Sequence, residues 1–555
     1  MVGTESTTAA PVRPAVSPKT GTFNFEPVNR IGGGMSMNVR IDPATGRYAD
    51  AKLAADRFRG FEDILRGRDV RDAVFVSSRV CGYHGGQHSI AAVQAVEMAL
   101  DIAPPPMAVA LRNLGLCAEM VHAEAAHLVL LAAVDFSRML VGEHYPDVLA
   151  LAQKTPAEHV ELHGYATIGD IMGSFDPITG RWYRDAFSVA RIPYEMYAVI
   201  HGKYPHPETI VPGGVGSYMS HTAVSKIQDY AVRLLSLVDP AKRIVQMVFD
   251  LLDFLASVPG LSDIGVGPKN FIDSGMWDDP ELYDHTWEGL ALRSTMRWAA
   301  PGVILDGQLV TGDLREVAAG VEEDTSLSFY DDIPRSLPGA PYPVVQRRSH
   351  PERRNWNGKR SWCASARWRG NAVETGPGAR LWTTAMRGSM PRPNPFIAAQ
   401  NGSVFLLLPE GGQGGLSEMM IEWRPPAVWN AIERTRARTV GIVFAALTAA
   451  VQALTVFDLQ KESRHQTAVE FKLKKSGERF GVGFAGDGML GHWLALDGEL
   501  IQDYRIIGPS TFNVGPGGPA EAAINATPAL EGTPTGQEAL IALRSFDPCL
   551  NCATH

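Results

Sequence analysis

The last residues of the chain, SFDPCLNCATH, carry two cysteines and a histidine that could bind a metal. Cys549 and Cys552 have the spacing that lets two thiolates converge on one ion, and His555 follows three residues later. Pro548 stiffens the approach to the first cysteine. Redox-active cysteine pairs share this spacing, so the segment alone indicates either a metal site or a dithiol.

A second group of possible ligands lies near the N-terminus, in SRVCGYHGGQH. Cys81, His84 and His88 are soft or borderline donors on a glycine-rich turn directly before an apolar segment. Taken alone, the two histidines are also consistent with core or helix-capping side chains. Cysteine motifs near both ends of one chain are explained if the fold buries both ends around a single thiolate-bound metal.

Long apolar segments with helical periodicity must position these motifs. We expect them at residues 89–102 and 107–140, which the run APPP separates, and at 220–258 and 426–459. Their apolar residues fall on almost every face, as in helices buried within a large protein. Residues 23–53 and 491–516 alternate apolar and polar positions around glycines, which is typical of strands. The sequence predicts a predominantly helical α+β fold, with a buried bundle of long helices flanked by small antiparallel sheets.

Composition excludes several classes of protein. The 555 residues include 51 Lys and Arg against 60 Asp and Glu, so no basic nucleic-acid-binding surface is expected. Five cysteines argue against a disulfide framework of the secreted type. No basic segment followed by an apolar run marks a signal peptide. We interpret the apolar segment 439–459 as a buried core helix and not as a transmembrane span, because polar residues interrupt it.

The chain shows no clear linker between its two motif-bearing ends. Residues 1–22 are rich in Thr, Ala, Pro and Ser and predict a disordered tail. Residues 23–555 are expected to form a single interwoven domain. Within it, residues 322–362 are polar, proline-rich and locally basic, which indicates a solvated surface excursion, with a specific anion site as the alternative.

Taken together, the motifs resemble those of the large subunit of nickel-iron hydrogenases, in a divergent, uptake or actinobacterial-like member. The pattern R-x-C-G-x-x-x-x-x-H at 79–88 and D-P-C-x-x-C-x-x-H at 547–555 carry the resemblance. Further segments resemble the family in family order: FRGFEDILRGRDVRDAVFVSSRVCG, SWCASARWRG, GPGARLW, IERTRAR, LGHWLALDGELIQDY and GPSTFNVGP. The resemblance covers residues from about 25 to 555 and implies the family's large-subunit fold.

The resemblance implies a nickel ion held by cysteine sulfurs, next to an iron that carries carbon monoxide and cyanide. Cys81 and Cys549 match terminal nickel ligands, and Cys552 matches a sulfur that bridges to iron. Soft thiolates suit nickel and are deprotonated by it, and Cys549 is the expected base when H2 splits heterolytically. Four further positions match residues around the diatomic ligands and the thiolates: Pro509, Ser510, Thr511 and His88.

A structural magnesium ion is also implied. Glu62 in RGFE and the imidazole of His555 match its family ligands, and a carboxylate suits a hard cation. Family precursors lose a C-terminal extension after this histidine once nickel is in place. An end at His555 therefore resembles the matured form, with the C-terminus buried.

The first motif departs from the family pattern at one ligand. The family has C-G-x-C, whereas His84 stands at the second cysteine position and becomes the expected fourth metal ligand. An imidazole nitrogen binds one metal but does not readily bridge two. Cys117 or Cys363 could replace the missing thiol only if the fold brought one of them close; each is otherwise a small buried core residue.

Two further positions near the expected centre differ. Asp487, in AGDG, stands where an arginine usually lies over the diatomic ligands, and we count it with the three motif cysteines among the expected catalytic residues. Gly32, in RIGGG, replaces a glutamate often assigned to proton transfer. These departures leave the expected fold intact and bear on the chemistry.

Three hypotheses follow. In the first, the chain is the catalytic subunit of a hydrogenase that oxidises H2 and passes electrons to an iron-sulfur small subunit, because it has too few cysteines for clusters of its own. In the second, it is a non-catalytic scaffold or electron-transfer subunit without the complete centre. In the third, Cys81, His84, Cys549 and Cys552 hold a structural zinc ion. We expect a hetero-oligomer that is cytoplasmic or membrane-associated through its partners.

Overall fold

The computed structural model describes residues 15–17, 21–217, 219–333, 339–342, 346–348, 358–411, 415–473, 475–530 and 535–554. The expected N-terminal tail lies mostly outside these residues, and the expected surface excursion lies partly outside them. His555 is also outside the described residues. The predicted fold class is confirmed: the chain is a mixed, mostly helical α+β protein with small antiparallel sheets.

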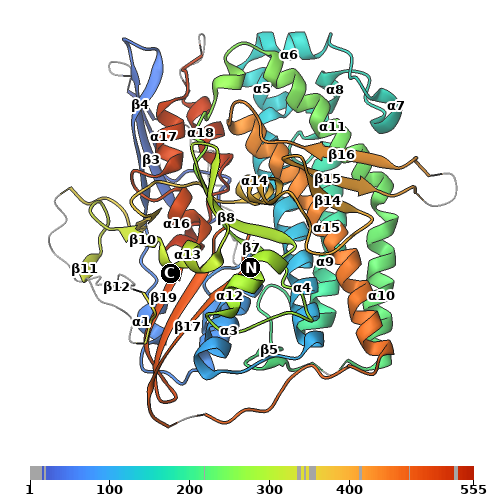
Figure 1. Cartoon of the computed structure of the whole chain (residues 1–555). Helices are drawn as coiled ribbons and strands as arrows, with labels where there is room; N and C mark the ends of the chain where they lie inside the picture. The colour runs from blue at the N-terminus through green and yellow to red at the C-terminus, as the bar shows by residue number, and fades with distance from the viewer. Residues whose placement is uncertain are drawn as a thin grey trace, which may run out of the picture.

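Most of the long helices form a bundle in the right half of the view in Figure 1, with α3 (Gly85–Leu100) at the lower middle. The other long helices are α4 (Pro106–Ala126), α9 (Arg181–His201), α10 (His221–Ser236), α11 (Val238–Ser257) and α15 (Ala431–Lys461). Helices α4 and α15 pack side by side, and α9, α10 and α11 pack around this pair. Every residue of α3 except Met98 is buried, which explains why its sequence shows no polar face.

The helices differ from the predicted segments at several boundaries. The segment 107–140 is not one helix, because α4 is followed by the π-helix η1 (His127–Ala132), the 3-10 helix η2 (Ala133–Phe136) and α5 (Arg138–His144). The segment 220–258 divides at Leu237 into α10 and α11. Helix α9 was not predicted; it contains Pro193, whose missing N–H and ring usually end a helix.

Two helical stretches are long and apolar enough to span a membrane by length and composition, Pro106–His144 and Ala431–Lys461. Both belong to the packed centre of the molecule, where α4 and α15 contact each other. The prediction that the segment 439–459 is a buried core helix is confirmed.

Small antiparallel sheets flank the helices. Three of them have orders β7-β8-β9, β14-β15-β16 and β17-β18-β19, and the N-terminal sheet has order β1-β2-β3-β4. Their strands are β1 (Ala15–Ser17), β2 (Thr22–Phe25), β3 (Met35–Asp42), β4 (Arg47–Ala55), β7 (Phe271–Met276), β8 (Ala299–Leu305), β9 (Gln308–Thr311), β14 (Ile397–Gln400), β15 (Ser403–Leu408), β16 (Met419–Trp423), β17 (Glu478–Phe484), β18 (Gly491–Asp497) and β19 (Leu500–Ile507). The pairs β5–β6, β10–β13 and β11–β12 comprise β5 (Ile210–Val211), β6 (Gly214–Val215), β10 (Val321–Asp324), β13 (Ser365–Trp368), β11 (Asp331–Ile333) and β12 (Gln346–Arg348).

Shorter helices connect these layers. They are α1 (Phe61–Leu65), α2 (Asp72–Ser78), α6 (Pro146–Ala152), α7 (Val160–His163), α8 (Ile168–Ser174), η3 (Leu261–Asp263), α12 (Gly289–Met296), α13 (Leu314–Ala319), α14 (Pro377–Arg387), α16 (Pro509–Asn513), α17 (Pro519–Asn525), α18 (Gln537–Arg544) and α19 (Leu550–Ala553).

The two ends of the chain pack against each other. The N-terminal strands β3 and β4 lie beside the C-terminal helices α17 and α18 (Figure 1). The Tyr48 hydroxyl donates to Glu538 Oε2 over 2.7 Å, and the Leu53 backbone N–H donates to Glu521 Oε1 over 2.7 Å. Strand β17 packs on α3. These contacts bring the segment before α3 next to the final helix α19, and with them the two cysteine motifs.

Candidate metal centre

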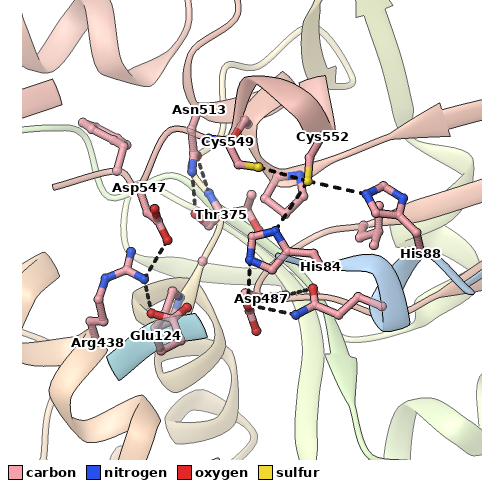
Figure 2. A pocket seen from close by; sticks show the side chains of 17 residues that line it. His84, His88, Glu124, Thr375, Arg438, Asp487, Asn513, Asp547, Cys549 and Cys552 are labelled. Atoms are coloured by element: carbon pink, nitrogen blue, oxygen red, sulfur yellow. Dashed lines mark hydrogen bonds and ion pairs between the residues drawn. The ribbon is translucent and has the colours of Figure 1, made fainter. Parts of the chain in front are cut away.

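A small cavity of about 30 Å³ lies where α3, α16 and α19 meet (Figure 2). Polar and sulfur-bearing side chains from distant parts of the chain point toward it. They include His84, His88, Glu124, Thr375, Arg438, Asp487, Ser510, Asn513, Asp547, Cys549 and Cys552. The cavity is therefore a meeting point of both ends of the chain.

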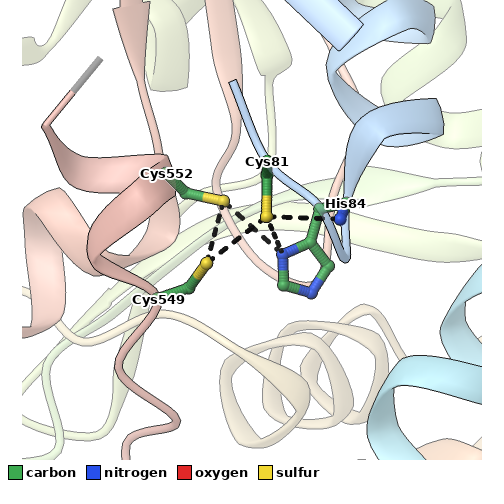
Figure 3. Close-up of side chains that lie close together, drawn as sticks. All are labelled: Cys81, His84, Cys549 and Cys552. Atoms are coloured by element: carbon green, nitrogen blue, oxygen red, sulfur yellow. Dashed lines mark hydrogen bonds between the residues drawn. The ribbon is translucent and has the colours of Figure 1, made fainter. Parts of the chain in front are cut away.

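Four possible metal ligands converge beside this cavity (Figure 3). The sulfur atoms of Cys81, Cys549 and Cys552 and a ring nitrogen of His84 all lie within 4.8 Å of one another. Cys81 Sγ is 3.4 Å from Cys549 Sγ, which is 3.3 Å from Cys552 Sγ. His84 Nδ1 lies 3.4 Å from Cys81 Sγ and 3.5 Å from Cys552 Sγ. Three thiolates and one imidazole form a donor set that suits a borderline transition-metal ion.

The protonation of this cluster follows from its burial and its neighbours. Burial disfavours a Cys81 thiolate, but hydrogen bonds from the other two cysteines and the charge of His84 outweigh it and place the pKa of Cys81 well below its ordinary value. Burial likewise opposes a charged His84, but the Cys81 thiolate outweighs it and raises the pKa of His84 well above its ordinary value. Burial raises the pKa of Cys552 well above its ordinary value. Burial and the neighbouring groups therefore favour thiolate character at Cys81 and a charged ring at His84.

Backbone contacts fix the C-terminal cysteines. Gly32 forms a parallel bridge with Cys549, and a Cβ added at Gly32 would lie 3.5 Å from Cys549 Sγ. The Cys549 backbone N–H donates to Ser510 Oγ over 2.8 Å. A Cβ at Gly508 would lie 2.5 Å from the Cys552 carbonyl oxygen, so only glycine permits this approach of α16 to α19.

Arg59 joins the two cysteine motifs. Its guanidinium donates to the carbonyl of Val80, directly before Cys81, and to the carbonyl of Asn551, directly before Cys552, over 3.0 Å in the second case. A third bond of 3.1 Å reaches the carbonyl of Arg79. Arg59 lies in the segment FRGFE, and no sequence motif predicts this role for it.

Two of the three predicted residues on α16 line the cavity, and the third does not. Pro509 and Ser510 line the cavity. Thr511 is fully buried, and its hydroxyl oxygen is 3.4 Å from the Gly508 backbone N–H instead. Asn513, which was not predicted, lines the cavity and donates through Nδ2 to the Thr375 carbonyl over 2.9 Å.

Asp487 lies beside His84, opposite the cysteines. Its Oδ2 is 3.5 Å from His84 Nε2 and accepts a hydrogen bond of 2.9 Å from Gln87 Nε2 (Figure 2). The Asp487 backbone N–H donates to Gln87 Oε1 over 3.0 Å. The carboxylate that replaces the family's arginine is therefore paired with the imidazole that replaces the family's cysteine.

His88 begins a buried chain of polar contacts on the other side. His88 Nε2 lies 3.5 Å from Cys552 Sγ, and its Nδ1 lies 3.0 Å from His492 Nε2. His492 Nδ1 is 2.8 Å from the Tyr504 hydroxyl, which is 3.2 Å from Ser77 Oγ. Burial lowers the pKa of His88 to about 3, so its ring is neutral and can hold a hydrogen bond to sulfur without adding charge.

A group of charged side chains that the sequence did not predict borders the cavity: Arg438, Glu124 and Asp547, with His127 beside them. Arg438 of α15 is bonded to Glu124 of α4 and to Asp547 Oδ2, the latter over 3.2 Å. His127 Nε2 lies 3.3 Å from Asp547 Oδ1. Burial raises the pKa of Glu124 to about 7, against the opposing effect of Arg438. Arg438 lies in the quoted segment IERTRAR, whereas nothing in the sequence near Glu124 points to this pairing.

The expected magnesium ligands are only partly described. Glu62 is buried, and its Oε1 accepts a hydrogen bond of 2.8 Å from the Ile506 backbone N–H. His555, its expected partner, lies outside the described residues. The magnesium site remains a prediction.

Neither remaining cysteine supplies a fourth thiolate. The described residues include a single cluster of potential metal ligands that contains cysteine, and neither Cys117 nor Cys363 belongs to it. Burial raises the pKa of Cys117 well above its ordinary value, as for an apolar core residue. Cys363 donates to the Ala364 carbonyl over 3.1 Å. His84 is therefore the fourth donor of the cluster.

Comparison with known proteins identifies the family. The family model described as "Nickel-dependent hydrogenase" matches residues 59–160 and 176–555. The chain belongs to this family, as the sequence motifs predicted. It is 26% identical to the quinone-reactive Ni/Fe-hydrogenase large chain of Wolinella succinogenes, over 96% of this chain and 95% of the relative. It is 25% identical to the hydrogenase-2 large chain of Escherichia coli, over 96% and 97% of the two chains.

A solved structure agrees with this assignment. The actinobacterial-type NiFe-hydrogenase from Ralstonia eutropha H16 superposes with a TM-score of 0.90 at 32% identity, covering 96% of this chain and 100% of that chain. This protein is thus a nickel-iron hydrogenase large subunit in both sequence family and fold, with a histidine in its cluster of potential ligands.

Proposed function

We propose that this hydrogenase family member is the catalytic subunit that oxidises H2, with electrons passed to an iron-sulfur small subunit. One observation carries the proposal: the family's thiolate motifs converge in a buried cluster in which His84 completes a set of four donors. A scaffold that had lost its metal chemistry would have no need to keep three converging sulfur atoms.

The residues present fit a nickel ion. Cys81, His84, Cys549 and Cys552 would hold it, and all four donor atoms are close enough to share one metal. Cys552 and Ser510, which line the small cavity, are the residues that would hold the iron with its carbon monoxide and cyanide. When bound, this centre supplies the heterolytic cleavage of H2 and accepts its electrons.

The side chains of the protein supply the proton chemistry and the enclosure. Cys549 Sγ is the proposed proton acceptor, and Cys549 lines both the small cavity and a second cavity of about 100 Å³. Ser510 Oγ accepts from the Cys549 backbone N–H, which leaves its own O–H free to donate toward a cyanide nitrogen. Asp487 stands where the family usually has an arginine. The buried Arg438 lines the same cavity and is proposed to supply the positive charge instead.

The electron acceptor is proposed to be a partner chain. Iron-sulfur clusters generally require four cysteine ligands each, and the cysteines outside the cluster are Cys117 and Cys363, both buried in separate places. We infer a hetero-oligomer with an iron-sulfur small subunit, located in the cytoplasm or at a membrane through its partners. Magnesium at Glu62 and His555 remains part of this proposal.

The second candidate is the non-catalytic scaffold, which the replacement of a bridging cysteine by His84 favours. Metal content and gas uptake distinguish the two. Nickel, iron, zinc and magnesium would be counted by plasma mass spectrometry on the purified complex, with small-subunit iron subtracted, and H2 uptake would be measured with an artificial electron acceptor. One nickel per chain with uptake supports the enzyme. An intact complex without nickel contradicts it, and zinc at the cluster supports a structural site.

A further inference from the structure

A group of buried polar atoms without partners lies between α4 and α9, beside the metal centre. Glu119 of α4 is 0% exposed, and neither carboxyl oxygen has a hydrogen-bond partner of ordinary geometry among the described residues. The same holds for the Tyr197 hydroxyl and for His201 Nε2 on α9. A buried polar group that is left unpaired destabilises the fold. Three of them together call for a functional explanation.

Two glycines leave the space into which these atoms point. A Cβ at Gly86, in the first turn of α3, would lie 2.2 Å from Glu119 Oε2 and 2.1 Å from the Tyr197 hydroxyl. A Cβ at Gly115, one turn before Glu119, would lie 2.3 Å from His201 Nε2. Because residues four apart share a helix face, Glu119 with Tyr197 and Gly115 with His201 form two successive levels between α4 and α9.

The group extends from the metal centre toward the surface. At its inner end, Gly86 follows the ligand His84 by two residues, and the charges of His84 and Asp487 act on the Glu119 carboxyl. In its middle, the rings of Tyr197 and His201 are 4.9 Å apart between centroids. At its outer end, His201 Nδ1 lies 3.1 Å from Thr209 Oγ1, and Thr209 is partly exposed.

The three side chains are neutral near pH 7. Burial, opposed by the charge of His84, raises the pKa of Glu119 well above its ordinary value, so it is a carboxylic acid. Burial raises the pKa of Tyr197 well above its ordinary value and lowers the pKa of His201 to about 3. A carboxylic acid, a phenol and a neutral imidazole can each accept one proton while donating another.

We propose that Glu119, Tyr197 and His201 form the route by which protons leave the metal centre toward Thr209. The inference rests on the proposed function, because H2 oxidation releases protons in a site enclosed by protein. Glu119, Tyr197 and His201 do not hydrogen-bond one another in the structure, so each transfer between them follows a side-chain rotation that brings two of them into contact. The acid proton of Glu119 then moves to the Tyr197 oxygen and the phenol proton to His201 Nε2. The Nδ1 proton moves to Thr209 Oγ1, and the Thr209 hydroxyl proton passes to solvent. A proton from the centre restores Glu119, so one proton enters, one leaves and no electrons are exchanged. Gly32, beside Cys549, has no side chain to offer such a route.

The test compares the intact complex with Glu119→Gln, which keeps size and removes the acid proton, and with Tyr197→Phe. Tyr194→Phe is the matched control, since Tyr194 lies on α9 but is 40% exposed. Nickel content and thermal unfolding are measured first. Infrared spectra in H2O and D2O then detect the carboxylic acid band of Glu119, in loaded and in metal-free protein. H2 oxidation rates are recorded in both solvents.

We expect Glu119→Gln to keep its nickel, to lose one isotope-sensitive carboxylic acid band, and to oxidise H2 about 100-fold more slowly, as for a lost general acid or base. Its solvent isotope effect should rise, because proton exit becomes limiting. Tyr197→Phe should slow oxidation in the same way and Tyr194→Phe should not. An active parent with an equally active Glu119→Gln overturns the route alone, as does an unchanged infrared band. An inactive, nickel-free parent overturns both the route and the proposed function.

Discussion

The pairing of His84 with Asp487 is the residue-level feature that most distinguishes this centre. His84 Nε2 faces Asp487 Oδ2 at 3.5 Å, so a thiolate at position 84 would stand beside a carboxylate. We expect His84→Cys to hold nickel more weakly, by about the 10-fold to 100-fold that losing the pairing between a ligand and its outer carboxylate partner costs. The combined change His84→Cys with Asp487→Arg places a thiolate beside a guanidinium, which restores a pair of opposite charges. This double variant should bind nickel as the parent does. Nickel per chain, measured by plasma mass spectrometry, checks both.

A control separates this pairing from a general effect of added charge. Asp497→Arg adds the same positive charge at an exposed position in the β18–β19 hairpin and should leave the nickel content of His84→Cys unchanged. If His84→Cys alone bound as much nickel as the parent, charge pairing would not explain the histidine.

Glu124 gives a residue-level prediction about pH. Its pKa of about 7 in the fold exceeds its ordinary value of 4.5, because burial outweighs Arg438. Between these values the folded state holds a proton that the unfolded chain has lost, so the contribution of Glu124 to stability is full below about pH 4.5 and falls as the pH rises to about 7. Glu124→Gln should remove this fall.

The measurement must be a comparison, because His127 acts in the opposite direction. Burial lowers the pKa of His127 to about 4, so protonation of the unfolded chain destabilises the fold as the pH falls from 6.5. Denaturant unfolding of parent and Glu124→Gln, at intervals from pH 4.5 to 7.5, isolates the Glu124 contribution as their difference. A difference that does not change with pH would contradict the raised pKa.

At the level of elements, the contact of β17 with α3 positions the first motif. A Cβ at Gly483 would lie 2.0 Å from the Ala91 carbonyl oxygen, so Gly483→Ala must displace α3. We expect a loss of about 1–3 kcal/mol in the free energy of unfolding, the usual cost of overpacking, together with reduced nickel content because α3 begins next to His84. Gly312→Ala, whose Cβ would have its nearest neighbour at 3.8 Å, is the control for denaturant unfolding.

The elements also show which features a sequence can predict. Apolar periodicity indicated α3, α4 and α15, and the alternation of apolar and polar residues at 491–516 indicated the strands β18 and β19. The pattern did not indicate α9, because Pro193 interrupts it, or the π-helix that follows α4. Those two regions carry His201 and His127, so the missed elements also contain missed polar groups.

The sequence also predicts site residues that lie close together in the chain better than pairs that lie far apart in it. The cysteine spacing and His84 indicated a set of donors that the fold does bring together, because each half of the set is contiguous in the chain. Arg438 and Glu124 are 314 residues apart on apolar helices, and no local spacing relates them. Glu119 likewise lies on a mainly apolar helix, and its neighbours are known only from the packing of α4 on α9.

For the whole molecule, the metal is expected to tie the two ends of the chain together. Cys81 Sγ and Cys549 Sγ are 3.4 Å apart although 468 residues separate them in sequence. A ligand that binds only the folded state stabilises it by about 4 kcal/mol when its free concentration is 1,000 times the dissociation constant. The loaded protein should therefore unfold at a higher temperature than protein stripped by a chelator, in differential scanning calorimetry.

Single substitutions assign this stabilisation to the cluster. Cys81→Ser should unfold at the same temperature with and without the chelator, because a serine hydroxyl is a poor ligand for a borderline ion. Cys117→Ala removes a thiol that is buried away from the cluster and leaves a small cavity. It should lower the unfolding temperature of both the loaded and the stripped protein, and the difference between the two temperatures should stay as large as in the parent. Hydrogen exchange at residues 549–554 should accelerate on stripping in the parent and in Cys117→Ala, because a bound metal would add to the contacts that Gly32, Ser510 and Arg59 already make with this segment. If stripping left both the unfolding temperature and this exchange unchanged, the packing of the N-terminal sheet on α17 and α18 would suffice to join the ends, and the cluster would serve chemistry alone.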